Sequence, residues 1–222
     1  MKYLCLAFLM IMIALASAGC PNPTGFRASF TATSYNLGGG GSYFESGQAN
    51  IDFVGQRLSS VFDFFSEGNN MMGMTWQFGA NKTAYYMLSD GTCHESSSNS
   101  KIPSGYPEIT KDIGPLTIGV FPVEMFTVES DSPALNQTAL FDINNCVLVS
   151  SYLSNADESN PGFCSINFYN VGVPSDSDFQ LPQACIDVVG SSRPKIRFNH
   201  HKKNTFTQMS KTMNHILNAL KF

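Results

Sequence analysis

Residues 25–35 read GFRASFTATSY, so that the apolar residues from Phe26 to Ala32 alternate with polar or charged ones. Alternate side chains of an extended chain lie on the same face, and this pattern predicts a half-buried β-strand. Short apolar segments separated by glycine or polar turns repeat along most of the chain, which is typical of antiparallel strands. These segments cover residues 42–44, 50–54, 58–65, 75–78, 83–88, 116–121, 125–129, 138–143, 147–153 and 163–173. The sequence therefore predicts an all-β fold.

Helical spacing is confined to the C-terminal segment, residues 193–222. Apolar residues recur there at intervals of three or four and share one face of a helix. They are Phe206, Met209, Met213, Ile216, Leu217 and Leu220. We expect this amphipathic helix to cover one face of the sheet. Binding to a membrane surface is the alternative, and the scarcity of basic residues on the polar face argues against it.

Residues 1–18 have the organisation of a secretory signal peptide. A basic start and an apolar run precede the small residues Ala16-Ser17-Ala18, after which cleavage is expected. Residues 19–222 are then one exported domain without a transmembrane segment, because no later stretch has the roughly 20 apolar residues that a span needs. Lipid attachment at Cys20 is a second interpretation. It is disfavoured because Ser17 stands where a lipoprotein signal prefers a branched aliphatic residue.

Four cysteines behind this leader, Cys20, Cys93, Cys146 and Cys185, are suited to a disulfide framework. Disulfides persist in oxidising compartments, so the cysteines and the leader together predict a secreted protein. Four cysteines allow three connectivities, and their spacing does not choose among them. Cys164 is left over, and a buried free thiol, an intermolecular bridge and a rearranged pairing are its alternatives.

Two glycosylation sequons fit the same secretory route. They begin at Asn81 and Asn136, and both side chains must lie at the surface if they carry glycans. The sequence therefore predicts a glycoprotein.

The composition excludes two classes of partner. Charged residues make up 14% of the chain and the formal net charge is −4, so the protein lacks the basic field that nucleic acid or an anionic membrane requires.

The motifs of common enzymes are absent. The chain has no GxSxG elbow, no HExxH, no CxxC and no phosphate-binding glycine loop. A hydrolase that uses His94 or His215 is kept only as a remote class of function, and we expect no enzymatic activity.

Asp176 and Asp178 are the candidate metal ligands. Calcium takes oxygen ligands from flexible loops, and these two carboxylates with nearby carbonyls could supply them. A plain turn, in which Asp and Ser side chains accept backbone N–H groups, is the favoured interpretation.

Several motifs occur in an order that resembles the ependymin-related proteins. They are Cys20-Pro21, Asp52 with Gln56-Arg57-Leu58, Tyr85-Tyr86 before Cys93, Ile102-Pro103, Cys146, and a closing segment of Phe168-Tyr169-Asn170-Val171-Gly172-Val173, Phe179, Pro182 and Cys185. The resemblance covers residues 20–185, and the closing segment is its most specific part. A further cysteine pair that many family members carry is missing here.

The resemblance implies two stacked antiparallel sheets that form a half-open sandwich, similar to lipoprotein-carrier domains, around an apolar pocket. It also implies a secreted or lysosomal glycoprotein that forms homodimers, associates with extracellular matrix in a calcium-dependent way, binds lipids and has no catalytic site. By the same resemblance Cys20 pairs with Cys146, and Cys93 pairs with Cys185. Closing such long loops restricts the unfolded chain by roughly 4 to 5 kcal/mol each.

The function expected from the sequence is that of a non-enzymatic binding protein that holds a lipid or fatty-acyl ligand in this pocket. An apolar chain gains about 0.8 kcal/mol for each methylene that it buries. The candidate pocket residues are Trp76, Phe78, Tyr86, Phe121, Phe126 and Phe168. The alternative is a structural adhesion protein without an occupied pocket.

Overall fold

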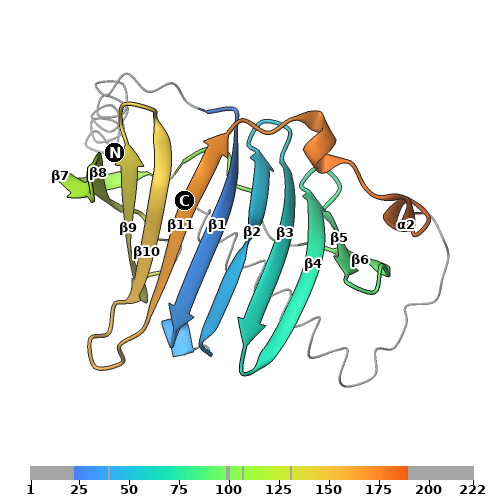
Figure 1. The fold of residues 1–222 in the computed structure, drawn as a ribbon, viewed down its shortest axis with the longest axis horizontal. Helices are drawn as coiled ribbons and strands as arrows, with labels where there is room; N and C mark the ends of the chain where they lie inside the picture. Colours follow the sequence, from blue (N-terminus) through green and yellow to red (C-terminus); the bar gives the residue numbers. More distant parts are fainter. Residues whose placement is uncertain (1–22, 40, 99–100, 107, 131, 190–222) are drawn as a thin grey trace, which may run out of the picture.

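Eleven antiparallel strands form one sheet in the part of the chain that the computed structural model describes, residues 23–39, 41–98, 101–106, 108–130 and 132–189 (Figure 1). The order across the sheet is β6-β5-β4-β3-β2-β1-β11-β10-β9-β8-β7. The strands are β1 (Gly25–Tyr35), β2 (Tyr43–Asp52), β3 (Arg57–Ser66), β4 (Asn69–Phe78), β5 (Thr83–Leu88), β6 (Cys93–Ser97), β7 (Ile109–Ile118), β8 (Phe121–Val128), β9 (Leu135–Asp142), β10 (Val147–Asn155) and β11 (Phe163–Gly172). The short helices are η1 (Leu37–Gly39), η2 (Asp176–Phe179) and α2 (Gln183–Ile186).

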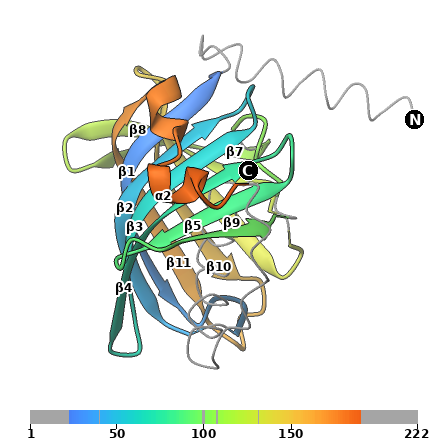
Figure 2. The same cartoon turned by 90° about the vertical axis from the view of Figure 1, so that its right-hand side faces the viewer.

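The predicted all-β antiparallel fold is confirmed, and β1 has the bounds that its alternating pattern predicts. The strands form one continuous hydrogen-bonded sheet, whereas the resemblance implies two stacked sheets. The sheet bends so that its two ends lie on the same side of the central strands (Figures 1 and 2). The two layers of the expected sandwich are therefore the two halves of a single curved sheet.

Ring contacts of Tyr106 give a measure of this curvature. The centre of its ring lies 6.0 Å from that of Phe53, at the end of β2, and 5.6 Å from that of Phe141 in β9. Phe53 and Phe141 are therefore within about 12 Å of each other, whereas four strand spacings in a flat sheet come to roughly 19 Å. The concave side, which we call the inner face, carries the main hydrophobic core.

The connection from β6 to β7 closes the inner face. These two strands are the opposite edges of the sheet, so the chain between them must cross from one edge to the other. Ile102 and Tyr106 of this connection pack in the inner core, and Ile102 is almost completely buried. The polar, serine-rich composition of residues 94–104 is typical of an exposed loop. The burial of Ile102 shows that this interpretation of the sequence is wrong.

The structure also differs from the sequence prediction at other places. The predicted strand segment 116–121 is divided by a turn between β7 and β8. Residues 93–97 form the edge strand β6 although His94–Ser97 are polar, because backbone pairing with β5 requires no apolar side chain. Residues 43–52 form one uninterrupted strand, whereas the sequence suggests two segments separated by Gly47. A Cβ atom at Gly47 would lie 2.0 Å from the carbonyl oxygen of Val61, so glycine here permits close pairing with β3 and does not mark a turn.

Several sequence predictions fall on residues outside the described part of the chain. These are the signal peptide at residues 1–18, Cys20, and the C-terminal helix within residues 193–222. Within the described residues, no helix has the length and apolar character that a membrane crossing requires.

The close approach at Gly47 gives a test of the sheet register. Replacing Gly47 by alanine should destabilise the protein by about 1 to 3 kcal/mol, because the new methyl group meets backbone atoms of β3 that have no room to move. Gly172→Ala in β11 is the matched control, since no atom lies within 4 Å of its added Cβ. Urea unfolding of both variants measures the difference. Equal stability of the two variants would contradict the register between β2 and β3.

Candidate ligand-binding face

The inner face is lined by aromatic side chains from strands far apart in the sequence. Phe26 and Phe30 of β1, Phe62 of β3 and Phe168 of β11 all belong to its core. The ring of Phe26 packs edge-on against Phe168 with 5.3 Å between the ring centres. The inner face is therefore apolar and aromatic, which is the kind of lining that hydrophobic ligand sites have.

The six candidate pocket residues do not lie on one face. Tyr86, Phe126 and Phe168 belong to the inner core. Trp76 and Phe78 belong to a second cluster on the opposite, convex side, which we call the outer face. Phe121 is 69% exposed at the start of β8. A single site on the inner face can therefore include only the first three.

Polar atoms without partners are concentrated on the inner face. Among the described residues, four buried side-chain oxygens have no hydrogen-bond partner: both carboxyl oxygens of Glu45, the Ser60 hydroxyl and the Thr75 hydroxyl. Ser60 and Thr75 are directly opposite each other on β3 and β4. Their strand neighbours Phe62 and Gly73 show that both side chains point to the inner face. Buried polar groups normally find partners, so these atoms mark a place where a bound molecule can supply them.

Glu45 is the functional candidate that sequence analysis missed. It is 1% exposed and lies in β2 between Ala32 of β1 and Phe64 of β3. Burial raises the pKa of its carboxyl group well above the usual value, because the charged form is poorly solvated there. The sequence signal that could have identified Glu45 is its position in β2, where Tyr43, Glu45 and Ala49 occupy alternate positions and so lie on the same face. The apparent break at Gly47 obscured that signal.

Tyr43 and Cys164 form a polar pair next to Glu45. The Tyr43 hydroxyl and the Cys164 sulfur are 3.6 Å apart. Cys164 is a buried free thiol, which agrees with the first of the three alternatives for it. Burial is the main cause that raises the pKa of this thiol to about 11, so it stays protonated at neutral pH.

Tyr106 covers the end of the inner face near Phe26 and Phe53. Its ring packs edge-on against both, with 6.0 Å between ring centres in each case. Burial raises the pKa of Tyr106 to about 12, although a backbone hydrogen bond with Leu148 opposes the shift. The Gln56 side chain donates to the Pro103 carbonyl at 3.1 Å and so ties the same connection to the β2–β3 turn.

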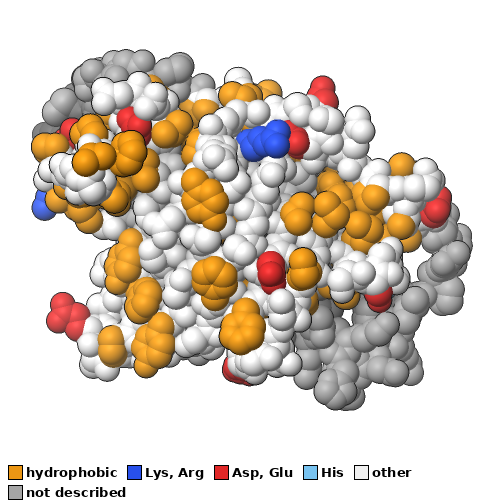
Figure 3. Space-filling view, viewed as in Figure 1, with side chains coloured by type: hydrophobic (Ala, Val, Ile, Leu, Met, Phe, Trp, Pro, Cys, Tyr) orange, Lys and Arg blue, Asp and Glu red, His pale blue; other side chains and the backbone are white. Residues whose placement is uncertain are grey.

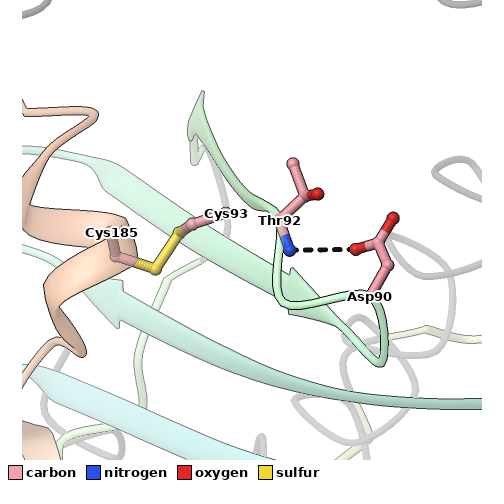
Figure 4. The surroundings of a disulfide bond; sticks show 4 residues. All are labelled: Asp90, Thr92, Cys93 and Cys185. Carbon is pink, nitrogen blue, oxygen red and sulfur yellow. Dashed lines mark hydrogen bonds between the residues drawn. A yellow bond between two sulfur atoms is a disulfide. The ribbon is translucent and has the colours of Figure 1, made fainter.

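A disulfide fixes the closing segment on the outer face. Cys93 at the start of β6 is bonded to Cys185 of α2, as the family resemblance implies (Figure 4). The two cysteines are buried with Trp76 and Tyr85 in the outer cluster. Cys146 is also disulfide-bonded. Its predicted partner, Cys20, lies outside the described residues.

Arg57 joins the motif around Asp52 to the closing segment. Its guanidinium group donates to the carboxylates of Asp52, at 2.9 Å, and Asp176, at 2.8 Å. The same group lies 4.6 Å from the centre of the Phe179 ring. The Ser59 hydroxyl donates to the Asp178 carbonyl at 2.7 Å. The motif residues therefore meet in space as a structural clamp on the outer face.

The two candidate metal ligands take part in this clamp. Asp176 accepts from Arg57, and the Asp178 carboxylate lies 3.5 Å from Arg27. Asp178 also accepts from the backbone N–H of Ser175 at 2.7 Å, and this hydrogen bond is the main cause that lowers the pKa of its carboxyl group. Among the described residues, no group of three or more His, Cys, Asp or Glu side chains has an arrangement that could hold a metal ion. Calcium binding by this turn stays a prediction.

The remaining predicted residues that the structure describes are exposed or half-buried. The side chains of Asn81 and Asn136 are exposed, as glycosylation would require. His94 is half-buried in β6 opposite Tyr86, and His215 lies outside the described residues.

The outer face carries an exposed aromatic patch where β1, β2, β3, β10 and β11 meet at one end. Phe44 and Phe65 are paired across β2 and β3, and the rings of Tyr152 and Phe163 are stacked with 6.1 Å between their centres. Tyr35 packs beside Phe163. Tyr35, Phe44, Phe65 and Tyr152 are each 44 to 54% exposed. Figure 3 shows separate apolar side chains on this face, in the lower part of the view. An exposed apolar patch of this kind is typical of an interaction surface.

The family model for the ependymin domain of amoebozoa matches residues 18–211. The chain belongs to the ependymin family. An uncharacterized protein from Dictyostelium discoideum is 26% identical to this chain over 177 residues, which cover 75% of this chain and 56% of the relative. The ependymin chain thus spans about half the length of that curated relative.

Solved structures similar to this ependymin chain have low identity. A DUF1329 family protein from Desulfovibrio piger is 10% identical with a TM-score of 0.35, over 77% of this chain and 94% of that protein. A domain from Vibrio parahaemolyticus, provisionally described as an outer membrane lipoprotein-sorting protein, is 9% identical with a TM-score of 0.33, over 78% and 95% of the two chains. A β-barrel-like DUF1849 protein from Brucella abortus is 8% identical with a TM-score of 0.33, over 69% and 99%.

Glu45 should make the stability of the protein depend on pH. Its raised pKa means that the folded state keeps a proton that the unfolded chain releases above its ordinary pKa of 4.5. Stability should therefore fall as the pH rises above that value, by up to about 1.4 kcal/mol per pH unit until the folded-state pKa is passed. Glu45→Gln removes this dependence, so its advantage over the wild type should be larger at pH 7.5 than at pH 4.5.

Urea unfolding at the two pH values measures this effect. Glu95→Gln, on an exposed position of β6, is the control and should show no such pH-dependent gain. If the difference between Glu45→Gln and the wild type is the same at both pH values, the carboxyl group of Glu45 is ionised in the folded protein and our description of it is wrong.

Proposed function

We propose that this protein is a secreted, non-enzymatic carrier that binds a hydrophobic ligand against the inner face of its curved sheet. The observation that carries the proposal is the group of unpartnered buried oxygens of Glu45, Ser60 and Thr75 in a mainly apolar interior. Leaving such groups unpaired costs about 1 to 3 kcal/mol each. A ligand that supplies the missing hydrogen bonds and buries its apolar part would offset this cost.

The position of the polar atoms supports a ligand of extended shape. Glu45 is separated along β2 by four residues from Ala49, which is the partner of Ser60. Four residues of a strand span roughly 13 Å. Between them lie Gly47 and the aromatic ring of Phe62 on the neighbouring strand. A ligand with an extended apolar chain and polar groups can lie along the inner face between Glu45 and Ser60. A lipid is therefore the class of ligand that we favour.

A second candidate function is adhesion through the outer face. The exposed aromatic patch around Phe44, Phe65 and Phe163 favours it, because such a patch can associate with another protein surface. Calcium-dependent association with extracellular matrix and homodimer formation are both proposals of this kind. Chelation of calcium should release the protein from matrix under the adhesion model and leave a bound lipid in place under the carrier model. Extracellular release is the proposed destination, with the lysosome as the alternative.

Met71 and Met72 provide a matched test of the carrier function. Met71 packs against the inner core, whereas Met72 is 55% exposed on the outer face. Met71→Gln should weaken binding of a neutral fluorescent naphthylamine probe to the delipidated full-length protein by about 5- to 30-fold, which corresponds to about 1 to 2 kcal/mol of lost apolar contact. Met72→Gln should bind the probe as the wild type does.

Fluorescence titration of the three proteins measures this difference. Equal loss of affinity in both variants would place probe binding elsewhere, and absence of saturable binding to the wild type would contradict the carrier function.

A further inference from the structure

Glu45 occupies an unusual position for a carboxylic acid. Its side chain is 1% exposed and neither oxygen has a partner among the described residues. It is flanked across the sheet by Ala32 and Phe64, which offer no hydrogen bond from their side chains. A glutamine or leucine would fit the same alternation of the strand without the cost of a buried acid. This cost is understandable if the carboxyl group binds a partner that enters with the ligand.

Among the described residues, no lysine or arginine contacts or pairs with Glu45. No lysine or arginine is buried among the described residues. Arg27 and Arg57 form their ion pairs with aspartates of the outer-face clamp. Tyr43 and Cys164 are the titratable groups that interact electrostatically with Glu45. Both are acids whose raised pKa keeps them neutral at ordinary pH. A ligand with a free carboxylate would therefore meet no lysine or arginine of the described residues on the inner face. Its carboxylate would lie beside the carboxyl group of Glu45.

The aromatic residues near Glu45 suit the opposite charge. Tyr43 lies two positions away on the same face of β2, and its ring packs against that of Phe64 with 5.2 Å between centres. Phe30 and Phe62 flank the next inner position, Gly47, from the neighbouring strands. Aromatic faces attract cations, and aromatic rings with a carboxylate are the typical protein environment for an ammonium group.

We propose that Glu45 binds the ammonium group of a long-chain amine, with the alkyl chain of the ligand lying along the inner face. This proposal rests on the carrier function and specifies its ligand class. Glu45 enters the complex as a neutral acid, transfers its proton to solvent and pairs as a carboxylate with the charged amine. Binding of the protonated amine therefore releases one proton for each ligand bound.

The test compares three twelve-carbon probes that differ only in their head group: dodecylamine, dodecan-1-ol and dodecanoate. Each displaces the neutral fluorescent probe from the delipidated full-length protein at pH 7. Dodecylamine should bind about tenfold more tightly than the alcohol, since an ion pair with aromatic contacts contributes more than a neutral hydroxyl. Dodecanoate should bind most weakly of the three. Calorimetry in two buffers of different ionisation enthalpy should detect the released proton with dodecylamine and none with the alcohol.

Glu45→Gln is the diagnostic variant and Glu95→Gln its control. The Glu45 variant should lose the preference for the amine and bind the alcohol as the wild type does, and the control should keep the full preference. Equal weakening of all three probes by Glu45→Gln would mean that Glu45 has only a structural role and would overturn the inference. The inference would also be overturned if the wild-type protein bound dodecanoate as tightly as dodecylamine, or more tightly. This comparison uses the wild-type protein alone and does not depend on the folding of a variant. Binding of the alcohol without an amine preference leaves the carrier function standing, whereas absence of binding by all three probes removes both proposals.

Discussion

The connection between β6 and β7 constrains the whole molecule, because it joins the two edges of an eleven-stranded sheet. A chain that runs from one edge to the other must cross one face, and this crossing buries Ile102 and Tyr106 against the inner core. The contacts of Tyr106 with Phe53 and Phe141 require the intervening strands to curve. The same connection therefore accompanies the curvature of the sheet and covers its inner face. Together these two features form the buried interior of the protein.

The outer face holds this arrangement in place. The disulfide between Cys93 and Cys185 fixes α2 beside the edge strand β6. Arg57 joins the β2–β3 turn to η2 through two aspartates. These contacts include four of the residues that carry the family resemblance, Asp52, Arg57, Cys93 and Cys185. Other residues of the resemblance, among them Ile102 and Phe168, pack in the inner core. The motifs of the ependymin family in this chain therefore contribute both to the outer-face contacts and to the inner core, whereas Glu45, Ser60 and Thr75 of the candidate site lie outside these motifs.

Most of the fold could be predicted from side-chain alternation, since nearly every strand carries apolar residues on its inner face. β6 could not, because a serine-rich edge strand is stabilised by backbone pairing and not by its side chains. The continuity of β2 through Gly47 could not be predicted either. From the sequence alone, a glycine that permits close approach of two strands cannot be distinguished from a glycine that ends a strand. The candidate site was harder still. The aromatic residues of the two faces could not be separated without the register, and Glu45 is recognisable only once both of its neighbours are known.

The central claim is that the inner face holds a hydrophobic molecule. Native mass spectrometry of the secreted full-length protein, before and after organic extraction, tests it most directly. We predict a noncovalent adduct with the mass of a lipid, which extraction removes and which an added long-chain amine replaces. A protein that is secreted without any adduct and takes up no apolar molecule after extraction would contradict the claim.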